Sequence, residues 1–321
     1  MGINFSRHIY PVHTTILNKK DWIIAAYAGN ELGPGKNGLL LNKASIEQSG
    51  FNTIILGLLH IGRGNICPAC PSPWNPDGAQ TGDIIFNNIF IVSDEKLPEQ
   101  IPPLTDWANL LNQVSISTNL SWSFGGGAAW ISDFYTIYDV FLHQDEIPET
   151  SILYKNMQIL YDKFPAVRCV DIDCEEICGP DDYFDWQTTV VAFAKMCNNI
   201  GFSLSISPYT YKEDWQNIIT RTGYNSSYKP IISKINLQCY DGGAGNTPED
   251  WKLHEPYQTQ NYLPIIAGFW KDNTTEEITS DLELWKNDVS GGFIWNYGDK
   301  DKPDPNNKLY SDAILKGLNS T

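Results

Sequence analysis

The sequence predicts a closed (β/α)8 barrel of the TIM type, and two observations lead to this fold class. Eight short apolar, β-branched runs recur along the 321 residues, each ending in Gly, Pro or polar residues. Stretches with helical spacing lie between most of them, for example at 182–201 and 275–288. Strands that alternate with helices indicate a parallel sheet, and eight repeats over this length favour a barrel. The alternative is a doubly wound open sheet, but no Gly-rich phosphate loop follows the first run.

The eight runs divide the chain unevenly. In chain order they are residues 22–30, 52–60, 115–127, 166–176, 202–211, 235–243, 263–270 and 291–299. More than 50 residues, rich in Pro and Gly, separate the second run from the third. We expect an elaborated loop at 61–100 on the mouth of the barrel, in which the β-like segment 83–94 forms a hairpin.

The last two runs are joined by a short connection with room for one helix, so no α+β domain is inserted between strands 7 and 8. Residues 301–318 follow as the final loop and closing helix. We therefore expect a single domain at 21–321, preceded by an N-terminal extension at 1–20.

Charge argues against a nucleic-acid partner. The chain has 38 acidic and 22 basic side chains, a formal charge of −16 and a pI near 4.6, and such a surface repels phosphate backbones and anionic membranes. No apolar run has the length of a membrane span, and the first 20 residues lack the apolar centre of a secretory signal. The compartment stays open, and a monomer is the default expectation.

Cysteine and histidine give little support for a bound metal. The seven cysteines are an odd number, and Cys67, Cys70, Cys174 and Cys178 could form a zinc site, two tight disulfides or reduced thiols. Of the five histidines, only His60 ends a predicted strand. A metal-dependent barrel enzyme is therefore a weak alternative, and we expect neither a metal nor another cofactor.

The run "VRCVDIDCEE" (167–176) carries acids on alternate positions. Residues two apart in a strand share a face, roughly 6.6 Å apart, so Asp171, Asp173 and Glu175 line up on one side. In a barrel they point inward, with Glu175 nearest the C-terminal end, where barrel active sites form. Three acids this close cannot all stay ionised, and a carboxyl that keeps its proton can act as a general acid. Cation binding or helix capping are the alternative roles.

Several motifs on the predicted strands resemble those of glycoside hydrolase family 18, the chitinase family. "DIDCEE" (171–176) resembles its D-x-x-D-x-D-x-E signature, and "SFGG" (123–126) its S-x-G-G. "QCYD" (238–241) is similar to its Q/M-x-Y-D/N, and "GGFIW" (291–295) to the segment that ends in its sugar-site Trp. "YSDAIL" (310–315) resembles the last helix of the small single-domain plant and bacterial members.

Two positions depart from this pattern. Arg168 stands where the signature has its first Asp, and Cys174 stands where an aromatic residue usually precedes the Glu. Arg168 lies on the face of the strand opposite to Asp171, Asp173 and Glu175, so its presence need not remove a catalytic group.

The resemblance implies retaining hydrolysis of a β-1,4 bond next to N-acetylglucosamine, in chitin or chito-oligosaccharides, and favours an extracellular location. In this mechanism the acetamide oxygen of the substrate attacks the anomeric carbon. Glu175 would be the general acid and base, and Asp173 would orient the acetamide N–H. Asp171 would share a proton with Asp173, and Tyr240 would donate to the acetamide carbonyl.

The resemblance also implies a set of sugar-binding residues. Trp295 would floor the site, and Gln238 and Asp241 would hydrogen-bond sugar hydroxyls. Aromatic residues at or after strand ends are candidate sugar platforms: Tyr27 and Tyr209 above all, and also Trp130, Tyr211 and Trp270. The short connection between the last two runs suggests an open groove, which favours internal cleavage.

Two other functions fit the same barrel. A lectin or inhibitor would bind glycans or a foreign enzyme without turnover. An endo-β-N-acetylglucosaminidase would act on N-glycans or cell-wall glycan, and the 61–100 loop could carry that preference.

Overall fold

The computed structural model describes residues 22–34, 43–64, 78–99, 103–126, 133–175, 184–241, 246–252, 263–299 and 302–320. Within these residues, eight parallel strands form a closed barrel, because the first strand pairs with both the second and the last. The strands are β1 (Ile23–Ala28), β2 (Thr53–Ile61), β5 (Asn119–Gly125), β6 (Cys169–Asp173), β7 (Ser203–Ile206), β8 (Ile232–Leu237), β9 (Ile265–Trp270) and β10 (Gly291–Trp295). Each falls on one predicted run, although β8 begins earlier than its run. The predicted (β/α)8 barrel is therefore confirmed over the open sheet.

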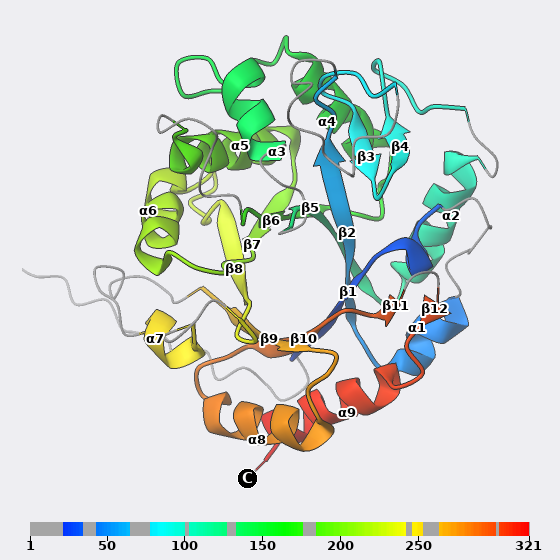
Figure 1. The fold of residues 1–321 in the computed structure, drawn as a ribbon, viewed down its shortest axis with the longest axis vertical. Helices are drawn as coiled ribbons and strands as arrows, with labels where there is room; N and C mark the ends of the chain where they lie inside the picture. The colour runs from blue at the N-terminus through cyan, green and yellow to red at the C-terminus, as the bar shows by residue number, and fades with distance from the viewer. Residues whose placement is uncertain are drawn as a thin grey trace, which may run out of the picture.

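Helices surround the strands on the outside of the barrel (Figure 1). They are α1 (Lys43–Ser49), α2 (Leu104–Val114), α3 (Asp133–Thr136), α4 (Ile152–Lys163), α5 (Trp186–Ile200), α6 (Lys212–Thr222), α7 (Pro248–Lys252), α8 (Thr275–Trp285) and α9 (Asn307–Leu318). Short helical turns lie at Asn30–Leu32 and Ile137–Phe141. Local sequence fixes several helix ends, as in the capping box of α8, where Thr274 and Glu277 satisfy each other's backbone N–H groups. In the described part of the chain, no helix combines the length and the apolarity needed to cross a membrane.

The connection between β2 and β5 carries the predicted hairpin. β3 (Ile84–Phe86) pairs antiparallel with β2, and β4 (Ile89–Val92) pairs with β3. The tight turn between them has positive φ at Asn87 and Asn88, which asparagine tolerates better than most residues. The Asn87 side chain also bonds the backbone of β2, at Gly57 O and Leu58 N. The hairpin is thus fixed to the C-terminal half of β2.

The other end of the chain also agrees with the predicted organisation. The connection from β9 to β10 contains α8 and no inserted domain. After β10 come a small pair of strands, β11 (Gly298–Asp299) and β12 (Lys302–Pro303), and then α9. Residues 1–20, the predicted N-terminal extension, lie outside the described residues.

The interior of the barrel is apolar on one side and polar on the other. The outer faces of the strands pack under the helices in one large apolar core. Inside, a second and smaller cluster comes mostly from β1, β9 and β10: Ala25, Tyr27, Ile55, Ile266 and Phe293. Facing it, β5 to β8 contribute buried polar side chains: Ser123, Asp171, Ser205 and Asn236. This polar half carries the acids of β6.

Candidate active site

The strand β6 places its acids as the alternation predicts. Val170 and Ile172 are fully buried in the outer core, and Cys174 joins them there. Asp171 and Asp173 point to the barrel interior and are also buried, while Glu175, just after the strand, is half-buried. The three carboxyls therefore run from the middle of the barrel to its C-terminal mouth.

Asp171 is held by hydrogen bonds from four neighbouring strands or strand ends. Tyr27 Oη (2.8 Å), Ser123 Oγ (3.0 Å) and Ser207 Oγ (2.7 Å) donate to its Oδ2. Ser205 Oγ (2.7 Å) and Asn236 Nδ2 (2.8 Å) donate to its Oδ1. These five hydrogen bonds satisfy both carboxyl oxygens of Asp171 and fix the side chain behind Asp173.

Asp173 and Glu175 form a hydrogen-bonded pair in front of Asp171. Burial raises the pKa of Asp173 well above its ordinary value, and the charges of Glu175 and Asp171 raise it further. Burial also raises the pKa of Glu175, although the hydrogen bonds from Gln238 and Asp173 counteract this. The shared hydrogen bond raises the pKa of Asp173 and lowers that of Glu175. Asp173 therefore pairs with Glu175 in the structure, and the expected sharing of a proton between Asp171 and Asp173 stays a prediction.

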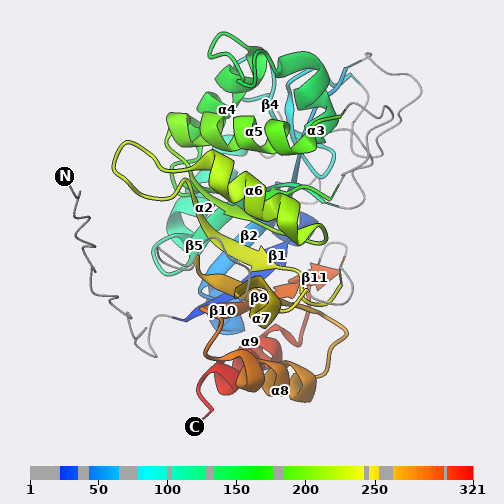
Figure 2. The same ribbon diagram turned by 90° about the vertical axis from the view of Figure 1, so that its left-hand side faces the viewer.

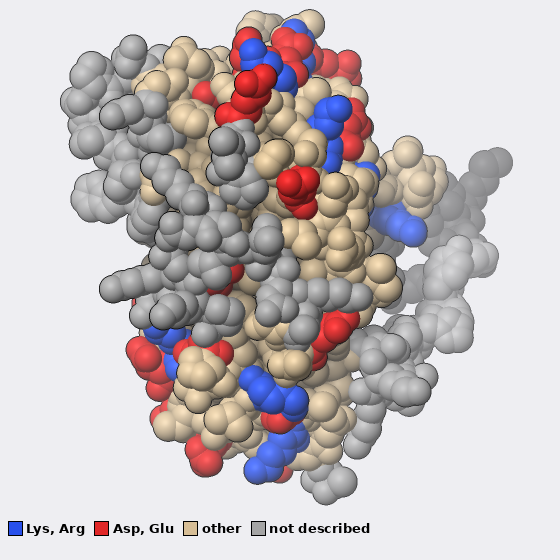
Figure 3. Space-filling model, turned by 90° about the vertical axis from the view of Figure 1, so that its right-hand side faces the viewer, with Lys and Arg blue, Asp and Glu red and all other residues tan. Residues whose placement is uncertain are grey.

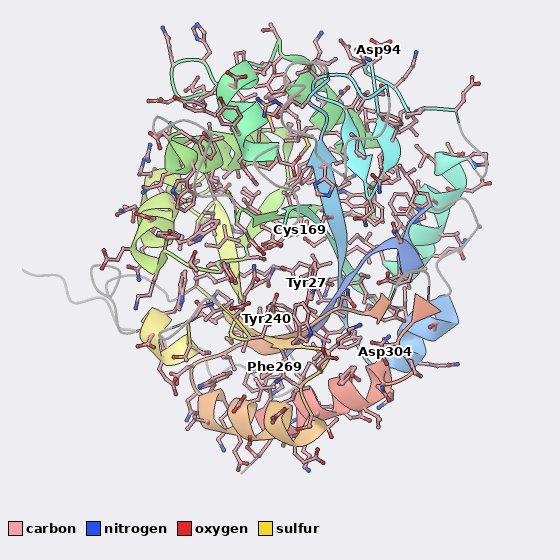
Figure 4. All side chains as sticks on the ribbon, viewed as in Figure 1. Tyr27, Asp94, Cys169, Tyr240, Phe269 and Asp304 are labelled. Carbon is pink, nitrogen blue, oxygen red and sulfur yellow. The ribbon has the colours of Figure 1, made fainter. Side chains whose placement is uncertain are left out.

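Gln238 connects this pair to Tyr240. Its Nε2 lies 3.0 Å from Asp173 Oδ1, 3.1 Å from Glu175 Oε1 and 3.1 Å from Ser207 O. Its Oε1 accepts a hydrogen bond from Tyr240 Oη at 3.1 Å. Burial raises the pKa of Tyr240 well above its ordinary value, and the charge of Asp173 adds to this, so the hydroxyl stays a donor. Figure 4 shows Tyr240 and Tyr27 near the centre of the barrel.

The loop that carries Gln238 and Tyr240 is itself held by a buried amide. Asn246 Nδ2 donates to the main-chain oxygens of Gln238 (2.7 Å) and Asp241 (3.1 Å). Asn246 Oδ1 in turn accepts from Trp251 Nε1 of α7 at 3.0 Å. The loop is therefore fixed at both ends of the motif 238–241.

A pocket of about 240 Å³ opens above the acid pair. Its lining residues are Gly126, Asp173, Glu175, Tyr209, Gln238, Tyr240, Asp241, Trp270 and Trp295. Trp295 packs on Tyr27, with 5.2 Å between ring centroids, and Trp270 meets Tyr240 edge-on at 5.5 Å. The Trp270 indole donates to Asp272 Oδ2 (3.0 Å), which fixes an aromatic side chain that is still 38% exposed. The pocket thus combines carboxyls, an amide, phenols and two indole rings.

The glycines of the motif 123–126 let β5 approach β6 closely. A Cβ at Gly125, where φ is +111°, would lie 2.0 Å from Asp173 O. The next residue, Gly126, donates its N–H to the same oxygen at 2.7 Å. A side chain at Gly125 would therefore displace the backbone of Asp173.

The structure brings most of the predicted residues into one site, but Tyr27 takes a different position. Its ring is only 2% exposed beneath Trp295 and Phe293, and its hydroxyl bonds Asp171. Tyr27 therefore lies beneath the site, and its buried ring is not accessible to a sugar. Tyr211 is 53% exposed but does not line the pocket, and Trp130 lies outside the described residues.

Sequence reasoning missed the groups that hold the site in place. Ser205, Ser207 and Asn236 hydrogen-bond Asp171, and Asn246 holds the 238–241 loop. Alternation along β7 and β8 was a usable signal, because inward-facing polar residues opposite acids are expected to be their partners. Asn246 had no such signal.

The departures from the family signature face away from the pocket. The Arg168 guanidinium stacks on the Tyr161 ring of α4, 3.8 Å from its centroid. Cys174 is buried in the outer core. Neither side chain is among the hydrogen-bond partners of Asp171 given above.

No metal site is evident in the part of the chain that is described. Of its cysteines, Cys169, Cys197 and Cys239 are free thiols, and no cluster of three potential ligands occurs there. His60 Nδ1 instead bonds Asp133 Oδ2 at 2.8 Å. The remaining cysteines of the proposed zinc or disulfide group, Cys67, Cys70 and Cys178, lie outside the described residues.

Comparisons with known proteins identify the fold. No protein-family model matches the sequence, and no curated protein matches it. Among solved structures, a chitinase from Bacteroides thetaiotaomicron has a TM-score of 0.55 at 12% identity, covering 93% of this chain and 96% of its own. Human YKL-39, a pseudo-chitinase with retained chitooligosaccharide binding properties, has a TM-score of 0.53 at 11% identity, covering 93% and 100%. A β-1,4-D-mannanase from Cryptopygus antarcticus has a TM-score of 0.55 at 15% identity, covering 93% and 91%.

These proteins share the barrel over nearly its whole length. The chain therefore has the (β/α)8 fold of chitinases and chitinase-like proteins, in agreement with the resemblance found in its motifs. The mannanase shows that the same barrel also occurs with a different substrate, so the fold alone does not define the chemistry.

Proposed function

We propose that this protein is a glycoside hydrolase that cleaves β-1,4 bonds next to N-acetylglucosamine, with retention and with the substrate's acetamide as nucleophile. One observation carries the proposal: a hydrogen-bonded Asp173–Glu175 pair, bridged by Gln238, lies in a pocket walled by Trp270 and Trp295. A raised pKa in a carboxyl at the pocket surface is what a general acid requires near neutral pH.

Glu175 is the general acid in this proposal. It is the outermost acid of the three, so the leaving oxygen of a bound glycan can reach it. Its resting partner Asp173 holds the proton of the pair. An acetamide N–H that donates to Asp173 favours the ionised form of Asp173, and the proton then passes to Glu175. Substrate binding is thereby coupled to protonation of Glu175.

The acetamide of the substrate is the nucleophile of the reaction. Its oxygen attacks the anomeric carbon while the glycosidic bond breaks and the leaving oxygen takes the proton of Glu175. Tyr240, which now donates to Gln238, can turn its donated hydrogen bond to the acetamide carbonyl. Asp173 and, behind it, the fixed charge of Asp171 balance the positive oxazolinium. Water then opens this intermediate, and Glu175 recovers its proton.

The walls of the pocket suit a sugar ring. The C–H faces of pyranoses pack on aromatic rings, and Trp295 and Trp270 supply two of these. Asp241 and Tyr209 add polar groups, and the two side chains share a hydrogen bond. The single-helix connection between β9 and β10 leaves that side of the rim without an added wall. An open rim favours cleavage within a chain.

The test is hydrolysis of a fluorogenic N-acetylglucosamine trisaccharide by the protein and by its Glu175→Gln variant. We expect turnover by the protein and a loss of at least about 100-fold in kcat for the variant, the usual contribution of a general acid. A fluorogenic β-1,4-mannotrioside serves as the control, since it has no acetamide and should not be cleaved. Turnover that survives in Glu175→Gln, or cleavage of the mannoside alone, would refute the proposal.

A second candidate is glycan binding without turnover. It is favoured by the similarity to YKL-39, which retains chitooligosaccharide binding as a pseudo-chitinase. Binding of the trisaccharide by calorimetry, with no hydrolysis between pH 4 and 8, would support this candidate instead.

A further inference from the structure

Trp270 lies beside Trp295 at the mouth of the barrel and offers a second aromatic surface to a bound glycan. The two residues are register partners on the parallel strands β9 and β10. Figure 2 shows these strands side by side above α8 and α9. Residues that are level on neighbouring parallel strands point to the same face of the sheet, and both indoles line the candidate active-site pocket. Two consecutive sugars of a chain can therefore each lie on an indole ring.

The indole of Trp270 is fixed although it is exposed. Its Nε1 donates to Asp272 Oδ2 at 3.0 Å, and its ring meets the Tyr240 ring edge-on at 5.5 Å. The main-chain N–H of Trp270 donates to Asn273 Oδ1 at 2.9 Å. An aromatic platform that is already held in position loses little conformational entropy when a sugar binds to it.

The pocket beside this platform is acidic. The described residues that line it include Asp173, Glu175 and Asp241, and none of these lining residues is Lys, Arg or His. Burial raises the pKa of Tyr240 well above its ordinary value, and the charges of the three acids raise it further. On the face shown in Figure 3, by contrast, basic side chains lie among acidic ones. A negative potential in the pocket attracts cationic ligands and repels anionic ones.

Asp272 adds a carboxylate at the edge of the platform. Because its Oδ2 accepts the indole N–H, the carboxylate lies at the Nε1 edge of the Trp270 ring. Within the described residues, Asp272 takes part in no ion pair. A carboxylate has about four lone-pair sites, so Asp272 can accept further hydrogen bonds from a ligand on Trp270.

The position of Asp272 favours one kind of sugar substituent. A pyranose that packs its C–H face on an indole leaves its equatorial substituents pointing past the edge of the ring. On Trp270, the substituents on one side therefore meet Asp272. A hydroxyl there donates a neutral hydrogen bond, whereas a protonated amino group donates a charge-assisted one, which is roughly twice as strong. The indole itself also attracts a nearby cation.

We propose that Trp270 and Asp272 form a second sugar subsite, which selects a glucosamine residue with a free, protonated amino group. This residue lies next to the N-acetylglucosamine over Trp295, so the substrate class is a partly deacetylated β-1,4 chain that contains both kinds of sugar. Sugars that carry a carboxylate are disfavoured at the same subsite. The inference rests on the proposed function, which places an acetylated sugar over Trp295.

The test measures binding by calorimetry at pH 6 with the Glu175→Gln variant of the full chain, which does not consume its ligands. The ligands are the β-1,4-linked N-acetylglucosamine disaccharide and the two disaccharides that carry one free amino group, on either sugar. At this pH an amine is protonated, since α-amino groups, for comparison, lose their proton at about 7.7–8.0. We expect one amino disaccharide to bind about fivefold more tightly than the acetylated one, as an exposed ion pair allows.

Two further substitutions, each made in the Glu175→Gln variant, separate the charge from the platform. Asp272→Asn keeps an oxygen that accepts the indole hydrogen bond but removes the charge, so it should abolish the preference and leave binding of the acetylated disaccharide unchanged. Trp270→Ala should weaken binding of all three ligands. The matched control is Asp162→Asn, since Asp162 is an exposed aspartate on α4 that does not line the pocket.

A preference for one amino disaccharide that Asp162→Asn keeps and Asp272→Asn loses supports the subsite. Equal affinity for all three disaccharides, a preference that survives Asp272→Asn, or no binding of any of them overturns it. Hydrolysis of the acetylated trisaccharide by the wild-type protein tests the proposed function separately. Turnover without an amino preference refutes the subsite alone, and an amino preference without turnover refutes the hydrolase alone.

Discussion

Replacing Gln238 with methionine removes a donor from both carboxyls of the candidate active site while nearly keeping the side-chain length. In the protein, Gln238 Nε2 lies 3.0 Å from Asp173 Oδ1 and 3.1 Å from Glu175 Oε1. Both hydrogen bonds lower the pKa of the carboxyl that accepts them. Their loss must therefore raise the pH at which the pair gives up its proton.

The size of the shift follows from the geometry. A hydrogen bond to a charged group contributes about 1.5–3 kcal/mol, and one pKa unit corresponds to about 1.4 kcal/mol. The two N–H groups of Gln238 serve three acceptors, because Ser207 O is also 3.1 Å away. We expect the apparent pKa of the pair to rise by about one unit.

The assay is the pH dependence of kcat/KM with the fluorogenic N-acetylglucosamine trisaccharide. Hydrolysis requires the protonated acid, so activity falls as pH rises through the pKa of the pair. In Gln238→Met this alkaline limb should move up by about one pH unit, while the maximal rate falls because Tyr240 loses its acceptor. An alkaline limb that stays in place, or moves to lower pH, would refute the assignment of Gln238 as donor to the pair.

Three further changes test the same site. Asp241→Asn removes a charge that raises the pKa of Glu175, so the alkaline limb should move to lower pH, opposite to Gln238→Met; a shift upward would contradict this. The pKa of Asp173 in the folded protein lies well above its ordinary 3.8. The contribution of Asp173 to the free energy of unfolding therefore falls as pH rises from about 4 through the raised pKa. Asp173→Asn should therefore have the higher unfolding midpoint at pH 7 and no advantage at pH 3, and calorimetry at both values checks this. Asn246→Leu, which frees the loop of Gln238, should lower kcat about 10- to 100-fold with the alkaline limb less sharply defined, whereas unchanged kinetics would remove Asn246 from its positioning role.

The sequence determined the barrel and the direction of its acids because both depend on local periodicity. Short apolar, β-branched runs separated by stretches with helical spacing indicate parallel strands. Within one of these runs, a period of two places Asp171, Asp173 and Glu175 on one face. The hairpin at 83–94 and the single helix between β9 and β10 could likewise be inferred from local pattern and length.

The tertiary structure decided which groups meet these acids. Ser123 and Ser205 reach Asp171 because the register of β5, β6 and β7 sets both level with it, and register is a property of strand pairs. Asn236 reaches Asp171 from β8, two residues beyond the register partner of Ser205. Tyr27 lies at a strand end, where a sugar platform would be expected. In the structure, however, Trp295 covers its ring, and its hydroxyl donates a hydrogen bond to Asp171.

Periodicity fixes the side of a strand on which a residue lies, whereas its contacts depend on residues far along the chain that packing brings beside it.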